Sequence, residues 1–339
     1  MMRAFARAVD AILEVTIVGS WSRLGYSIRR RLYRWPDLGS YPMHGKVVVL
    51  SGATSGIGRC AAEILARQGA RLWLLVRDEG RGQAVRDELA SRSGNGDIHV
   101  VVADLGDFDQ IRAAAAHVAE CETVVDVLIH LAGVLPSRRV ETAAGVELTL
   151  ATHLLGPWVL TKGLRPRLAA AGSGRVLWMS SGGMYTQRLA LDRLEMSATD
   201  YKGATAYARA KRAQVVLAQQ LSKEYSTDGV CVHALHPGWV DTPILSGNLP
   251  GFYRVMRRVL RTPHEGADTQ VWLAASDEAA QSTGEFWLDR RRRRTVYLPW
   301  TRTDAREVAR LIPWMDDRIA RADARGSASA SGDEQAGRN

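Results

Sequence analysis

The chain has 339 residues, of which 46% are hydrophobic, and a formal net charge of +9. This length and composition suit one large or two small globular domains with a sizeable core. The three cysteines are odd in number and scattered, which excludes a disulfide framework and favours a reducing, cytoplasmic location.

Residues 1–45 predict a basic amphipathic helix followed by a linker. The apolar run of residues 11–18 contains Glu14, so it fits no cleavable signal and is too short to span a bilayer. Two interpretations of the apolar stripe stay open: residues 1–35 contact a membrane surface, or the stripe docks on the main domain or a second subunit. The stripe consists of Val9, Ile12, Leu13, Ile17, Trp21, Leu24, Ile28 and Leu32.

The positive charge comes largely from three arginine clusters. Such clusters are either solvated faces or patches that hold nucleic acid, anionic lipid or a phosphorylated cofactor. No zinc-ligand spacing or nucleic-acid module accompanies them, so we expect no nucleic-acid partner and no metal. The clusters are Arg29–Arg31 with Arg34; Arg254, Arg257, Arg258 and Arg261; and Arg290–Arg294.

Helical and β-rich patterns alternate over residues 46–300, which predicts one doubly wound α/β domain with a parallel sheet. We expect strands near 46–51, 71–76, 98–103, 124–132, 175–180, 230–236 and 284–288. A first helix is expected to follow the glycine-rich turn and to end near residue 68. Further helices are expected near 80–92, 107–119, 145–171, 204–225, 251–261 and 264–276. A C-terminal helix over 301–321 and a disordered tail over 322–339 complete the chain.

A glycine-rich turn, Ser-Gly-Ala-Thr-Ser-Gly-Ile-Gly at residues 51–58, links the first expected strand to a helix. Glycines let the backbone turn tightly and approach a pyrophosphate, whose charge the helix amino terminus stabilises. This context predicts a dinucleotide seat on a Rossmann-type sheet. Its residues are Gly52, Thr54, Ser55, Gly56, Ile57 and Gly58.

Residues at the ends of the next three strands bear on the choice of dinucleotide. Arg77 stands where an acidic residue would bind the ribose hydroxyls of NAD(H), so it favours the 2′-phosphate of NADP(H). A pairing of Arg77 with either of the two acidic residues that follow it is the alternative. Asp104 is expected to accept a hydrogen bond from the adenine amine or to cap the next helix. Ala132 and Gly133 would let the cofactor pass close to the backbone.

Tyr207 and Lys211 are four residues apart, which places a phenol and an ammonium on one helical face. A cation beside a phenol lowers the Tyr pKa, and such a tyrosine can exchange a proton with an alcohol or ketone. An exposed pair without function is the alternative, so the evidence lies in the order and spacing of this pair after the glycine turn.

Together these residues resemble the short-chain dehydrogenase/reductase family over about residues 44–300. Within it the chain is most similar to the subgroup of dehydrogenase/reductase member twelve and its bacterial relatives. The motifs that carry the resemblance are the glycine turn, Ala103-Asp104-Leu105, Ala132-Gly133, Ser180–Met184, Tyr207 with Lys211, and His-Pro-Gly-Trp-Val-Asp-Thr-Pro at 236–243.

The resemblance implies roles for individual residues. Tyr207 would be the general acid/base, Lys211 would lower its pKa and bind the nicotinamide ribose, and Ser181 would bond the substrate oxygen. The implied cofactor-binding set also includes Leu105, Pro237, Gly238, Val240 and Thr242.

Two histidines depart from the family pattern. The family's Asn-Asn-Ala-Gly begins with His130 here, and its catalytic Asn on the long helix aligns with His153. A modified proton relay through His153, a weakened enzyme and a merely packed histidine all stay open.

The segment after Thr242 is the usual substrate lid in this family, and here it carries Ile244, Leu245, Leu249, Phe252, Tyr253, Val255 and Met256. With Met184, Tyr185 and Trp239 as further walls, it predicts a lipophilic alcohol or carbonyl substrate. The alternative is that these residues pack against the sheet or a partner. A non-catalytic NADP(H) sensor or membrane scaffold is the competing function. The family also implies a homo-oligomer paired through the long helix and the Tyr207 helix, unless the amino-terminal helix covers that face.

Overall fold

The computed structural model describes the backbone of residues 2–336 and the side chains of residues 4–326. Its centre is one eight-stranded sheet with the order β3-β2-β1-β4-β5-β6-β7-β8, in which all neighbours are parallel except β7 and β8. The predicted doubly wound α/β fold is therefore confirmed. The strands are β1 Val47–Ser51, β2 Arg71–Val76, β3 Ile98–Val102, β4 Val127–His130, β5 Arg175–Met179, β6 Cys231–Leu235, β7 Phe286–Leu288 and β8 Arg291–Arg292.

Helices cover both faces of the sheet. One core contains Ile111, Leu164 and Leu217 from three helices of one face, and the other contains Leu65, Leu89 and Val271 from the opposite face. The helices of the first core are α6 Phe108–Cys121, α8 Gly156–Ala170, α9 Gly203–Glu224 and α14 Ala305–Ala336; those of the second are α4 Gly56–Arg67, α5 Glu79–Ser93 and α12 Pro263–Ala275.

Several elements differ from the sequence-based expectation. The long helix over 145–171 is broken into α7 Leu148–Leu150, a π-helical turn Ala151–Leu155 and α8. The basic helix expected over 251–261 is α11 Pro250–Met256, preceded by α10 Pro243–Asn248, and α13 Asp277–Ala280 follows α12. Strand β8 was not predicted.

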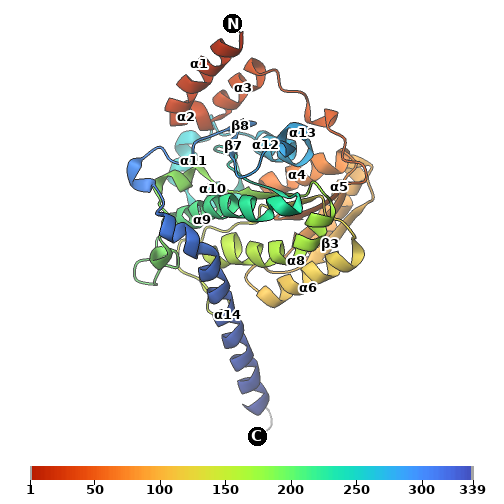
Figure 1. The fold of residues 1–339 in the computed structure, drawn as a ribbon, viewed down its shortest axis with the longest axis vertical. Helices are drawn as coiled ribbons and strands as arrows, with labels where there is room; N and C mark the ends of the chain where they lie inside the picture. The colour runs from red at the N-terminus through yellow and green to blue at the C-terminus, as the bar shows by residue number, and fades with distance from the viewer. Residues whose placement is uncertain (1, 337–339) are drawn as a thin grey trace.

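The C-terminal helix is longer than expected. Helix α14 runs to Ala336 and projects from the body, so helices α1 and α14 lie at opposite ends of the long axis (Figure 1). Ala322, where a disordered tail was expected to begin, is buried in the same core as Leu311, and the disorder of the tail stays a prediction. Residues 337–339 lie outside the described part of the chain.

Helix α14 packs on α9, and its Asp316 accepts hydrogen bonds from Trp158 and Lys162 of α8. It thus covers part of the face expected to pair two subunits, and the homo-oligomer stays a prediction.

The amino-terminal segment forms three short helices rather than one: α1 Met2–Val15, α2 Ile17–Trp21 and α3 Arg23–Leu32. Thr16 and Ser22 adopt extended backbone conformations and end the helical runs. The three helices lie against the sheet edge that carries β7 and β8 (Figure 1). Within residues 2–336, the helices lack the combination of length and apolarity that crossing a bilayer requires.

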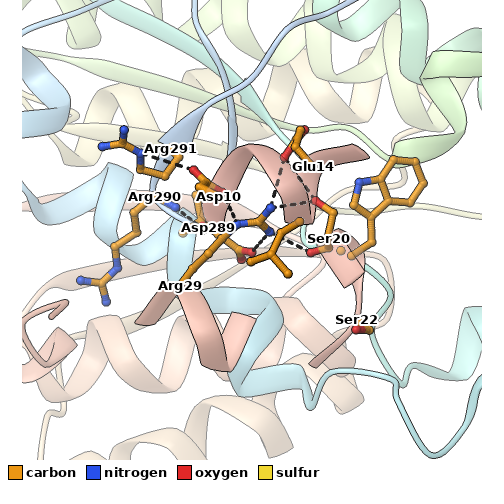
Figure 2. Close-up of polar contacts among 12 residues, drawn as sticks. Asp10, Glu14, Ser20, Ser22, Arg29, Asp289, Arg290 and Arg291 are labelled. Carbon is orange, nitrogen blue, oxygen red and sulfur yellow. Dashed lines mark hydrogen bonds and ion pairs between the residues drawn. The ribbon is translucent and has the colours of Figure 1, made fainter. Parts of the chain in front are cut away.

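A buried ion cluster fastens this extension to the main domain (Figure 2). Arg29 is fully buried and donates to Asp10 at 2.6 Å, to Asp289 at 2.8 Å and to Glu14 at 3.2 Å. Asp289 is also fully buried, and Arg261 donates to both of its oxygens at 2.5 and 2.9 Å. The arginine clusters of the sequence are thus only partly solvated faces, because Arg29 and Arg261 are internal structural groups.

The same cluster stabilises a strained turn. Asp289 and Arg290 join β7 to β8 with φ values of 56° and 50°, a left-handed conformation that non-glycine residues rarely adopt. Asp289 is fixed by the two arginines, and Arg290 donates to Asp268 at 2.7 and 2.8 Å. Ion pairs rather than the usual Asn-Gly pair thus hold this hairpin.

We predict that Asp289→Asn lowers the free energy of unfolding by about 3–5 kcal/mol, because it leaves two buried guanidinium groups short of a carboxylate. Asn tolerates a positive φ, so the loss reports the charge and not the backbone. Urea unfolding measures it. The matched control is Asp317→Asn, which removes an exposed ion pair with Arg321 and is expected to cost no more than about 0.5 kcal/mol. Equal losses in the two variants would contradict the structural role of the cluster.

Candidate active site

A cavity of about 530 Å³ lies at the carboxyl ends of the strands, where β1 and β4 are neighbours and the strand order reverses. In open α/β sheets this crevice is where ligands bind. The cavity lining includes every residue to which the sequence assigned a catalytic or cofactor-binding role. These are Gly52, Thr54, Ser55, Gly56, Ile57, Gly58, Arg77, Asp104, Leu105, Ala132, Gly133, His153, Ser181, Tyr207, Lys211, Pro237, Gly238, Val240 and Thr242.

The glycine turn after β1 forms a close-packed cradle. Gly52 has a φ of +78°, and a Cβ there would lie 2.6 Å from the Ala132 nitrogen. A Cβ on Gly58 would lie 2.1 Å from the Gly52 carbonyl oxygen. Side chains are therefore excluded at both positions. Gly56, Ile57 and Gly58 form the first turn of α4, whose N–H groups have no intrahelical partner and can receive a phosphate.

Arg77 extends from the end of β2 into the exposed rim of this cavity. Among the described residues it has no ion-pair partner, so the alternative pairing with its acidic neighbours is not formed. Asp78 instead caps α5 by accepting from the Arg81 amide at 2.7 Å. The Arg81 side chain donates to the Thr54 carbonyl at 3.4 Å, a second cation near the cradle that sequence reasoning missed.

Asp104 accepts a hydrogen bond from the Gly106 amide at 2.7 Å. It does not cap the next helix, because Asp107 accepts from the Asp109 and Gln110 amides in that role. The carboxylate of Asp104 therefore lines the cavity without a role in starting α6.

Ser181, Tyr207 and Lys211 line the cavity and lie close to one another. Ser181 follows β5 and its hydroxyl accepts from the Gly183 amide at 3.3 Å. A hydrogen bond with Ser181 acts to lower the pKa of Tyr207, but burial is the larger influence and raises it. The Lys211 ammonium lies 5.3 Å from the centre of the Tyr207 ring and donates to the Met179 carbonyl at 2.6 Å. Burial thus outweighs the Ser181 hydrogen bond in setting the pKa of Tyr207, and the lowering expected from Lys211 stays a prediction.

Burial also sets the protonation of Lys211, which is 3% exposed. It lowers the pKa of Lys211 from 10.5 to about 7. The amine is thus poised to lose or gain a proton near neutral pH, beside the phenol.

His153 lies in the π-helical turn Ala151–Leu155 and is buried against Tyr207. Its Nε2 lies 3.0 Å from the amide nitrogen and 2.8 Å from the carbonyl oxygen of Val134. The ring meets Tyr207 edge-on at 5.2 Å, and burial holds the pKa of His153 well below its usual range. Its backbone carbonyl accepts from Gln214 at 2.6 Å. His153 is therefore a neutral neighbour of the phenol, and its part in a proton relay stays a prediction.

His130 has a different environment. It is buried beneath the cavity, where its Nε2 lies 2.8 Å from the Thr161 hydroxyl and its ring packs on Trp178. Burial lowers the pKa of His130 to about 3, so this histidine is a neutral packing group.

Only some of the apolar residues expected to form the wall of the cavity line it. Ile244, Leu245, Leu249 and Phe252 line the cavity with Trp239, whereas Tyr253, Val255 and Met256 do not. The prediction that Met184 and Tyr185 are cavity walls is wrong, because both are buried in the core.

Trp21 of α2 supports this wall from behind, which the sequence did not indicate. Its ring meets Trp239 edge-on at 5.7 Å, and a Cβ on Gly182 would lie 2.4 Å from it. The Trp21 carbonyl accepts from the Trp239 amide at 2.8 Å. The sequence separation of Trp21 from these partners hides the contact. Ala204 and Ala208 were also missed, although their helical spacing from Tyr207 and Lys211 places them on the cavity face.

We predict that stability rises with pH between about 7 and about 10 because the unfolded chain, with a normal lysine pKa, binds more protons there than the folded protein. Lys211 raises the free energy of unfolding by up to about 1.4 kcal/mol for each pH unit in this range. Lys211→Met removes it. Urea unfolding across this range measures the slopes, and Lys223→Met, on the exposed face of α9, keeps that of the parent protein. A parent-like slope in Lys211→Met would show that Lys211 stays charged in the fold.

Comparison with known proteins agrees with this geometry. Residues 46–250 match the short chain dehydrogenase family. The chain is 36% identical to Dehydrogenase/reductase SDR family member 12 of Homo sapiens, over 73% of this chain and 77% of that protein. It is 29% identical to Retinol dehydrogenase 11 of Homo sapiens, over 82% of this chain and 86% of that protein. A solved structure of a "putative NAD(P) dependent gluconate 5-dehydrogenase" from Beutenbergia cavernae, with bound NADP, has a TM-score of 0.60 and 30% identity, and covers 73% of this chain and 96% of that one. The chain therefore belongs to the short-chain dehydrogenase/reductase family, whose members are oxidoreductases acting on alcohols and carbonyls.

Proposed function

We propose that this protein is an NADP(H)-dependent oxidoreductase that interconverts a lipophilic alcohol and the corresponding carbonyl compound. The observation that carries the proposal is the convergence of Ser181, Tyr207 and Lys211 in one cavity with the glycine cradle. The exposed Arg77 and the apolar lid supply the cofactor and substrate preferences.

The cradle fits a dinucleotide. Its two crowded glycines and the first turn of α4 would hold a pyrophosphate, and Asp104 would accept a hydrogen bond from the adenine amine. Arg77 has no carboxylate partner among the described residues, so its charge is available to a 2′-phosphate. A nicotinamide in this seat would donate or accept hydride.

The polypeptide would manage the proton and the charge. Tyr207 would give its proton to the carbonyl oxygen during reduction and take it back during oxidation. Ser181 would donate to the same oxygen and stabilise the negative charge that develops there. Lys211, with a pKa near 7 and its ammonium 5.3 Å from the centre of the phenol ring, would be the source of the proton that returns to Tyr207.

The lid favours an apolar substrate. Four aliphatic or aromatic lid side chains and Trp239 line the cavity. Burial of apolar substrate surface against them contributes roughly 25 cal/mol per Å². Retinol dehydrogenase 11, a relative, is named for an apolar alcohol, which supports the same substrate class.

We predict that Tyr207→Phe lowers kcat by at least about 100-fold, because it removes the proposed general acid/base, while NADPH binding is retained. Turnover is measured as the loss of NADPH absorbance during reduction of apolar aldehydes and ketones. Tyr201→Phe is the matched control, because Tyr201 bonds Thr149 and Glu147 outside the cavity. Parent-like turnover in Tyr207→Phe removes the acid/base assignment, and NADPH binding without turnover in the parent protein would favour the sensor function.

We also predict that Arg77→Asp weakens NADPH relative to NADH by about 10- to 100-fold, as expected for loss of a charge-assisted hydrogen bond. Fluorescence titration with each dinucleotide measures the ratio. Arg302→Asp makes the same charge change at an exposed position outside the cavity and is expected to leave the ratio unchanged. An unaltered ratio in Arg77→Asp would exclude this residue as the phosphate contact.

A further inference from the structure

Helix α1 is amphipathic, but its polarity is reversed relative to an ordinary surface helix. Surface helices usually bury their apolar stripe and expose their charged side. Here Asp10 and Glu14 face the protein, where Arg29 and Arg293 bind them at 2.6–3.2 Å. The opposite side of α1 is exposed and apolar, with Ile12 and Val15 at 68% and 85% exposure.

Helices α2 and α3 pack on α1 and carry further exposed apolar residues, and we call the whole set the outer apolar face. Single exposed apolar residues are common, but a contiguous set on adjacent helices indicates a contact surface. The buried ion cluster keeps the outer apolar face turned toward solvent. If α1 rotated to bury its apolar side, Asp10 and Glu14 would leave Arg29, and no other ion pair would replace theirs. The face consists of Phe5, Ala8, Ile12 and Val15 of α1, Ile17 and Val18 of α2, and Leu24 of α3.

Unpaired arginines lie near this face. Arg254, Arg257 and Arg258 are exposed, and none has a carboxylate partner within the described part of the chain. Val259, which follows them directly, accepts from the Arg23 amide at 2.9 Å, next to Leu24 of the face. Arg7 is exposed on α1 itself. The apolar residues thus have a basic border without internal neutralisation.

We propose that the outer apolar face and its arginine border bind the surface of an anionic lipid bilayer, with α1 and α2 lying in the headgroup layer. An apolar helical face gains energy by entering the acyl boundary, and the adjacent arginines attract anionic headgroups. A second copy of the chain fits less well, because it would bring the same arginines together without acidic partners.

This placement also brings the lid close to the membrane. Val255 of α11 is 78% exposed and lies beside Arg254, while Leu249 and Phe252 of the same segment line the cavity. Resting on the proposed function, an apolar alcohol or carbonyl would then pass from the bilayer to the lid without crossing water. The contact with lipid itself does not depend on catalysis.

The test is flotation of the full-length protein with phosphatidylcholine vesicles, with and without phosphatidylglycerol. We expect binding to the mixed vesicles, weakened by salt, and little binding to phosphatidylcholine alone. Ile12→Gln with Val15→Gln should lower partitioning by about tenfold or more. Arg257→Gln with Arg258→Gln should lower it by about tenfold or more on the mixed vesicles, since each arginine contributes about fivefold.

The matched control is Val102→Gln. Val102 is 44% exposed on β3, at the sheet edge opposite β8, so its replacement should leave vesicle binding unchanged. Thermal unfolding verifies that all variants fold, and NADPH binding verifies the cavity separately from the lipid contact. Absence of parent binding to mixed vesicles, or equal binding to both kinds, overturns the proposal. It is equally overturned if sedimentation shows a dimer that the Ile12 and Val15 changes abolish, since a second copy would then cover the face.

Discussion

The carboxylate of Asp289 is the contact on which the distinctive part of this structure depends. It is fully buried and shared by Arg29 of the amino-terminal extension and Arg261 of the segment after the lid. Arg261 also donates to the carbonyls of Trp21 and Pro237, the latter in the loop that lines the cavity. Four segments distant in the sequence therefore share one charge network. A buried charge with one partner removed is unfavourable, so each segment holds the others in place.

The central sheet and the gathering of the candidate site residues in one cavity were predictable because their signals are local. The glycine turn, the Tyr207–Lys211 spacing and the apolar runs of the parallel strands each occupy a few consecutive residues. Parallel strands place their carboxyl ends at one edge, so residues that follow separate strands converge there. For the same reason Arg77, Asp104, Gly133 and Ser181 all reach one cavity although the sequence separates them widely.

The remainder could not be predicted because it depends on partners far along the chain. Arg29 and Arg30 are adjacent and chemically identical, yet one is fully buried and the other exposed. The acidic partners of Arg29 lie at positions 10, 14 and 289, and no local pattern links them. Strand β8 was missed for a related reason, since its turn has Asp-Arg where short hairpins favour Asn-Gly. The helical spacing of α1 was visible, but which of its sides faces the protein is decided by this cluster.

The amino-terminal extension also supports the walls of the candidate active site. Trp21 ends α2, and its ring occupies the space that any side chain on Gly182 would need, one residue after Ser181. The same ring supports Trp239, which lines the cavity together with the lid residues. Displacement of α2 would therefore loosen the serine loop and the apolar wall together. Because α2 also carries Ile17 and Val18 of the outer apolar face, that face and the apolar wall of the cavity are joined through a single short helix.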